Sequence, residues 1–110
     1  MPRRAARVDD NHSTIVEWFR GMGCSVADTS AAGNGFPDLV VGQRGVSTLV
    51  EVKDGEKQAS QQKLTGAQEK FHAEWRGSIF VVTNITEATE VVKYLNQCAI
   101  AQKKGGVKRP

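Results

Sequence analysis

The sequence predicts a single α/β domain in which a mixed β-sheet is flanked by helices, with the element order α-β-β-β-α-β-α. Two apolar runs, residues 36–41 and 46–53, are separated by a Gly-Gln-Arg-Gly turn at residues 42–45, which is typical of a β-hairpin. A third apolar run, residues 78–83, follows a predicted helix. Its strand should therefore run parallel to the strand of residues 46–53, through a right-handed crossover.

The N-terminal part of this domain is expected to begin with a helix. Asp10 or Asn11 is placed to cap a helix that runs to about Met22, with apolar side chains at helical spacing and glycines following them. We expect a short strand at residues 24–27. Residues 29–35 are small and polar and contain two glycines, which indicates a flexible loop.

The C-terminal part is expected to contain two more helices. Residues 54–63 are polar and lack periodicity, so they are interpreted as a loop. Thr65 is placed to cap a helix that runs to about Trp75. The last helix is expected from residue 86 to about residue 97. We divide the chain into a flexible arm at residues 1–8, a core at residues 9–101 and a tail at residues 102–110.

Charge is unevenly distributed along the 110 residues, whose formal net charge is +3. Seven of the 15 Lys and Arg residues lie in the arm and the tail. Basic ends of this kind suit the phosphate backbone of a nucleic acid, although simple solubility is an equal alternative. The candidate DNA contacts in these segments are Arg3, Arg4, Arg7, Lys103, Lys104, Lys108 and Arg109.

Several classes of protein are disfavoured by the composition. The two cysteines lack CxxC spacing, which predicts free thiols in a reducing, cytoplasmic compartment rather than a zinc site or a disulfide framework. No run of 18 apolar residues is present, so no membrane span is expected. The basic N-terminus has no apolar segment behind it, which argues against a secretory signal.

A second pattern concerns chemistry, because two carboxylates and one amine are placed to meet. Glu51 and Lys53 have strand spacing, so their side chains share one face about 7 Å apart, while Val52 points to the core. If the apolar runs pair as a hairpin, Asp38 lies beside Glu51. The alternatives are a turn residue at Asp38 and a solvent-facing salt bridge between Glu51 and Lys53.

This constellation matches the needs of metal-dependent phosphodiester cleavage. Asp38, Glu51 and the Val52 carbonyl are hard oxygen ligands of the kind that Mg²⁺ prefers, and Mn²⁺ should substitute for it. The metal would lower the pKa of bound water and polarise the phosphoryl oxygen. Lys53 would hold or deprotonate the attacking water, or offset the charge of the transition state.

The motif Pro37-Asp38 followed by Glu51-Val52-Lys53 resembles the PD-(D/E)XK nuclease superfamily. The longer string from residue 35 to residue 55, continuing to Leu64-Thr65 and Gln68, is similar to the VRR-NUC branch and to small phage-type Holliday junction resolvases. The resemblance implies a restriction-endonuclease-like core, cleavage to a 5′-phosphate and a 3′-hydroxyl, and action as a homodimer on branched DNA. For a phage protein the site of action would be the host cytoplasm.

The resemblance also implies roles for residues outside the motif. Gln68 would face the site and contact metal-bound water or DNA, with a solvated glutamine as the alternative. The helix-one glutamate of archaeal relatives is replaced near Asn11 or His12, and the Asn11 amide oxygen would be its substitute for binding a metal-bound water. His72 is expected to be a surface or half-buried residue. Lys57 and Lys63, in the loop after the motif, are the best further candidates for phosphate contacts.

Together these features predict a Mg²⁺-dependent, structure-specific DNA endonuclease, with a Holliday junction resolvase that makes symmetric nicks as the leading interpretation. The first alternative is another nuclease of the same fold, such as a flap, nicking or restriction-like enzyme. The second is a DNA-binding module without catalysis, and a third is a partner-binding domain whose ends do the binding.

Overall fold

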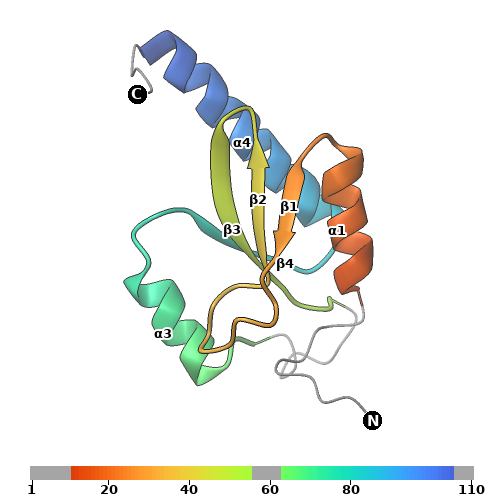
Figure 1. Cartoon of the computed structure of the whole chain (residues 1–110), viewed down its shortest axis with the longest axis vertical. Coiled ribbons are helices and arrows are strands. Elements are labelled where there is room, and N and C mark those ends of the chain that lie inside the picture. Colours follow the sequence, from red (N-terminus) through yellow and green to blue (C-terminus); the bar gives the residue numbers. More distant parts are fainter. Residues whose placement is uncertain (1–10, 56–62, 106–110) are drawn as a thin grey trace.

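A computed structural model describes residues 11–55 and 63–105 of the chain (Figure 1). The predicted order α-β-β-β-α-β-α is confirmed. Along the chain the elements are α1 (His12–Gly21), β1 (Ser25–Asp28), β2 (Leu39–Gln43), β3 (Val46–Val52), α3 (Gly66–Glu74), β4 (Ile79–Val82) and α4 (Ile85–Gly105).

The strands form one mixed sheet in the order β1-β2-β3-β4. β1 pairs with β2 and β2 with β3 in antiparallel fashion, whereas β3 and β4 are parallel, as predicted from the intervening helix. The hairpin turn is tighter than expected, because only Arg44 and Gly45 lie between the strands. Both have positive φ angles, 56° and 81°, which is the geometry of a two-residue type I′ turn.

One face of the sheet packs against α1 and α4 to form the core. Alternation along β3 directs Val50 and Val52 into this core, which also contains Phe19 of α1 and Leu95 of α4. Phe80 of β4 meets Tyr94 of α4 edge to face, with ring centroids 5.1 Å apart. The side chain of Glu51, between the two valines, therefore points to the opposite face of the sheet.

Helix α4 is longer than predicted. It was expected to end near residue 97, but it continues to Gly105. The added segment, residues 98–105, contains two alanines, one glutamine and two lysines, which favour helix, and this preference outweighs the loss of the apolar pattern. Lys103 and Lys104, which the prediction placed in the tail, belong to α4.

Helix α3 stands apart from α1 and α4 (Figure 1). Every residue of this helix, all within the described part of the chain, keeps at least partial exposure. Its apolar contact is aromatic: Phe71 meets Phe36 edge to face at 5.3 Å and stacks on Trp75 at 5.5 Å. Within the described ranges, no helix has the length and apolar character needed to cross a bilayer.

Candidate active site

The β2–β3 pairing brings two carboxylates to the same end of the hairpin. Leu39 pairs with Val50, so Asp38 lies opposite Glu51 at the next position along the two chains. The Oδ2 atom of Asp38 accepts a hydrogen bond from the backbone N–H of Val52 at 2.8 Å. Asp38 is 9% exposed and Glu51 is 1% exposed. Both acids are thus buried, Asp38 just before β2 and Glu51 on β3.

Lys53 joins this cluster from the end of β3. Its Nζ atom lies 3.9 Å from Oε2 of Glu51, and the residue is only 8% exposed. β3 is a central strand between β2 and β4, and both charged side chains are buried. The alternative of a salt bridge on a solvent-facing edge therefore does not describe this pair.

Gln68 of α3 connects the amine to the carboxylate. Its Nε2 atom donates to Oε2 of Glu51 at 2.8 Å, and its Oε1 atom accepts from Nζ of Lys53 at 2.9 Å. The same Oε1 accepts from the backbone N–H of Thr65, and the Thr65 hydroxyl accepts from the backbone N–H of Gln68. This capping box fixes the start of α3, so the predicted cap is confirmed and the alternative of a solvated glutamine is wrong.

The loop between β1 and β2 holds Pro37 and Asp38 in place, a role that sequence reasoning missed. The backbone N–H of Thr29 donates to the carbonyl of Asp38, and its hydroxyl donates to the carbonyl of Pro37, both at 2.7 Å. Gly35 has a φ angle of +80°, and a β-carbon there would overlap the backbone carbonyl of Ala67. The loop therefore packs directly against the first turn of α3, for which a glycine is required.

Asn11 precedes α1 at the N-cap position, but its side chain does not cap the helix. Its Nδ2 atom instead donates to the carbonyls of Lys53 and Thr83, at 3.2 and 3.0 Å. Since the Lys53 backbone pairs with β4 and the Val52 N–H faces Asp38, Asn11 approaches β3 from the β4 side. Its Oδ1 atom is buried without a partner in the described part of the chain. The predicted capping role is wrong for Asn11, which instead ties α1 to the ends of two strands, and the alternative cap, Asp10, lies outside the described residues.

A second polar pair lies beyond the motif and was not foreseen from the sequence. The Nε2 atom of His12 lies 3.0 Å from Oδ2 of Asp28, which joins α1 to β1. The hydroxyl and backbone N–H of Ser30 both hydrogen bond to Asp28, and with a smaller contribution from His12 they lower the pKa of Asp28 to about 2. Long-range pairing of a buried histidine with an exposed acid leaves no local signature in sequence.

The donor set of the cluster fits a divalent cation. The described residues contain no group of three or more His, Cys, Asp or Glu side chains suited to a metal. Asp38, Glu51 and the Val52 carbonyl are nevertheless all oxygen donors, as Mg²⁺ and Mn²⁺ prefer. Asp38 and Glu51 are both buried, and a bound cation would offset the cost of burying their negative charge.

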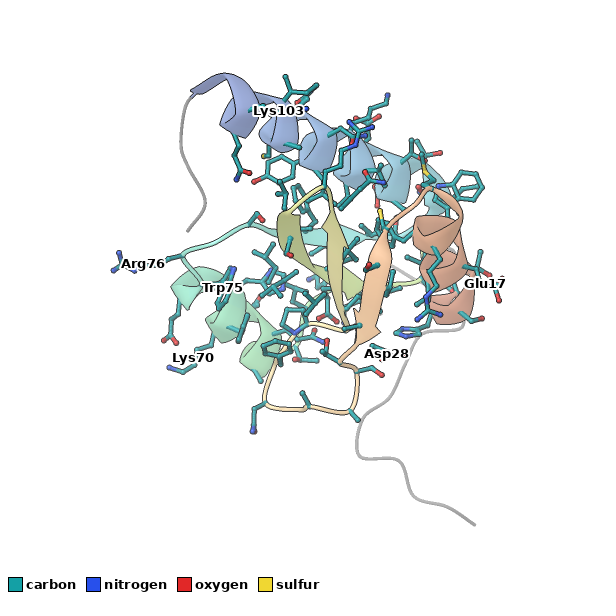
Figure 2. All side chains as sticks on the ribbon, turned by 45° about the horizontal axis from the view of Figure 1, so that its top comes forward. Glu17, Asp28, Lys70, Trp75, Arg76 and Lys103 are labelled. Atoms are coloured by element: carbon teal, nitrogen blue, oxygen red, sulfur yellow. The ribbon has the colours of Figure 1, made fainter. Side chains whose placement is uncertain are left out.

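The predicted phosphate contacts are dispersed or lie outside the described residues. Lys63 is exposed just before α3, whereas Lys103 lies near the far end of α4, away from the helix that carries Lys70 (Figure 2). Lys103 therefore does not join the carboxylate cluster. The structure describes no side chain for the remaining candidates, which are Arg3, Arg4, Arg7, Lys57, Lys104, Lys108 and Arg109.

The chain matches no protein-family model, no curated protein and no solved structure. The functional interpretation therefore depends on the geometry of the cluster around Glu51. That geometry gives two buried carboxylates, one buried amine and one amide that bonds to both kinds of group. Such a set is able to bind a cation, orient water and stabilise negative charge.

Proposed function

We propose that this chain is a Mg²⁺-dependent, structure-specific DNA endonuclease of the PD-(D/E)XK type that resolves Holliday junctions by symmetric nicks. The observation that supports this proposal is the convergence of Asp38, Glu51 and Lys53 at one end of the β2–β3 hairpin. The hydrogen bond from the backbone N–H of Val52 to the Asp38 carboxylate fixes Asp38 beside the strand that carries Glu51 and leads into Lys53. The mixed sheet with flanking helices is compatible with a restriction-endonuclease-like core.

The residues of the cluster divide the work of phosphodiester hydrolysis. Asp38, Glu51 and the Val52 carbonyl would hold Mg²⁺, which when bound acidifies water and polarises a phosphoryl oxygen. Lys53 would orient the attacking water and offset the negative charge that develops on the phosphate. Gln68 holds the Lys53 amine and the Glu51 carboxylate in fixed positions before substrate binds. Burial of the cluster strengthens each of these interactions by keeping bulk water away.

Junction resolution also sets a requirement on assembly. A four-way junction is two-fold symmetric, and its resolution needs two matched nicks. Each chain offers one candidate site within its described residues, centred on Glu51. A symmetric homodimer would present two such sites with the symmetry of the substrate. Exposed basic residues such as Lys63 would then contact phosphates on either side of the cut.

The decisive experiment offers the purified chain a four-way junction, a flap and a linear duplex of equal length, with Mg²⁺, with Mn²⁺ and with chelator. The proposal expects symmetric, metal-dependent nicks in the junction, which Asp38→Asn abolishes. Cleavage of the flap instead would keep the nuclease and change its substrate. Junction binding without cleavage under any metal would support a non-catalytic DNA-binding module. Sedimentation of the protein with junction tests the dimer.

A further inference from the structure

A second polar side chain of α3 lies on the side that faces the cluster. His72 follows Gln68 by four residues, so the two occupy neighbouring positions on one face of the helix. The Gln68 amide contacts both Glu51 and Lys53. His72 is half-buried, and its Nε2 atom is buried with no hydrogen-bond partner among the described residues. An unsatisfied buried nitrogen is unfavourable and calls for a functional explanation.

The surroundings of the His72 imidazole favour its neutral form. Burial is the larger cause that lowers the pKa of His72 below its ordinary 6.5, and the positive charge of Lys53 lowers it further. A neutral imidazole always offers one ring nitrogen as a hydrogen-bond acceptor. His72 therefore places an uncharged acceptor within electrostatic range of the Lys53 ammonium group.

Within the part of the chain that the structure describes, Lys53 has hydrogen-bond donors without an acceptor. An ammonium group carries three N–H donors, and the Oε1 atom of Gln68 takes one of them at 2.9 Å. That oxygen also accepts from the backbone of Thr65, so both of its lone pairs are used. Oε2 of Glu51, at 3.9 Å, is too distant for a hydrogen bond. Among the described residues, the Lys53 ammonium group therefore has one hydrogen-bond acceptor, and Nε2 of His72 has no partner.

We propose that His72 is a positioning residue for Lys53 in the proposed reaction, with Nε2 accepting an ammonium N–H when DNA is bound. A neutral acceptor suits this task, because it fixes the amine without cancelling the charge that Lys53 directs at the phosphate. A carboxylate in the same place would neutralise that charge. The inference rests on the proposed function, but its first test does not depend on catalysis.

That first test is an NMR titration of the His72 imidazole in the wild-type chain and in Lys53→Met. Removal of the positive charge should raise the pKa of His72. Lys70→Met is the matched control, because Lys70 lies on α3 but pairs with Glu74 at 2.8 Å on the exposed side. An unchanged pKa of His72 in Lys53→Met, or an equal rise in Lys70→Met, would overturn the relationship between His72 and Lys53.

The second test compares His72→Phe with His72→Gln on a four-way junction. Phe keeps a ring but removes the nitrogen, and we expect kcat to fall roughly tenfold with little change in KM. Gln restores a polar acceptor at similar reach and should recover most of the rate. Wild-type rates in both variants, or equal losses in both at unchanged unfolding temperature, would overturn the role of His72. Failure of the wild-type chain to cut any DNA would instead overturn the proposed function.

Discussion

The carboxylate of Asp38 and the backbone N–H of Val52 are joined by a hydrogen bond of 2.8 Å. Val52 separates Glu51 from Lys53, so this bond fixes the first acid of the motif against the strand that carries the other two groups. The register of β2 and β3 depends on the same relationship. A slip of one residue would turn Glu51 into the core and Val52 out of it.

Removal of this acceptor should destabilise the fold. In Asp38→Ala the buried N–H of Val52 loses its partner, and we expect a loss of about 1–3 kcal/mol in the free energy of unfolding. Asp38→Asn retains an oxygen that can accept the same bond, so its stability should stay much closer to the wild type. Urea unfolding of the two variants provides the comparison. Equal losses of stability in the two variants would show that the Asp38 carboxylate does not stabilise the fold through its hydrogen bond to Val52.

Gly35 should be far less tolerant of alanine than Gly33. Both glycines have positive φ angles, +80° and +75°, so the backbone strain of substitution is shared. Only at position 35 would the new β-carbon collide with the Ala67 carbonyl, and position 33 has nothing within 4 Å. Gly35→Ala should therefore displace α3 and reduce cleavage, which amide shifts of Gln68 and junction assays would detect. Similar behaviour of the two variants would contradict the packing of this loop on α3.

Two variants at the start of α3 can distinguish the capping of this helix from the positioning of the Glu51 and Lys53 side chains. Thr65→Ala removes a cap worth about 1 kcal/mol but leaves the Gln68 amide in reach of Glu51 and Lys53. Gln68→Ala removes part of the capping box and both site contacts. We expect comparable thermal unfolding for the two variants and a clearly larger loss of junction cleavage in Gln68→Ala. A loss of cleavage that tracks stability alone would assign Gln68 a purely structural role.

The stability of the fold at acid pH should depend on the hydrogen bonds that the Asp28 carboxylate accepts. Its pKa is lowered from 3.8 to about 2 in the folded chain, chiefly by Ser30. The stabilisation is therefore present above pH 3.8 and is lost as the pH falls toward 2. Because the side chain is half exposed, solvent screening keeps the effect small. The unfolding midpoints of the wild type and Asp28→Asn should come closer together as the pH falls from 3.8 toward 2. A difference that stays constant over this range would contradict the contribution of the Asp28 carboxylate.

The sequence predicted much of this architecture, because its signals were local. The glycine-containing turn at residues 42–45 and the alternating valines of β3 indicated the hairpin, and a helix between β3 and β4 required parallel strands. Thr65 and Gln68 carry the spacing of a capping box, so the start of α3 could be predicted closely. The predicted turn of four residues was too long, so the exact register, in which Gln43 pairs with Val46, did not follow from it. The adjacency of Asp38 and Glu51 was expected on condition that the two apolar runs pair, and β2 and β3 place these residues opposite each other.

Other features depend on contacts between distant segments and left no local signal. Asn11 looked like a helix cap, but the carbonyls of Lys53 and Thr83 compete for its amide and hold it. The close approach of Gly35 to α3 could not be read from a glycine-containing loop. The end of α4 was misplaced because helix propensity continues beyond the last buried residues.

Single-turnover cleavage of a four-way junction by Glu51→Gln tests whether Glu51 takes part in catalysis. The amide is nearly isosteric but removes a charged oxygen ligand, so we expect cleavage to fall at least about a hundredfold while junction binding is retained. Glu17→Gln, at an exposed position of α1 (Figure 2), is the matched control and should cleave normally. Cleavage by Glu51→Gln at the wild-type rate would remove Glu51 from the active site and contradict the proposed nuclease mechanism.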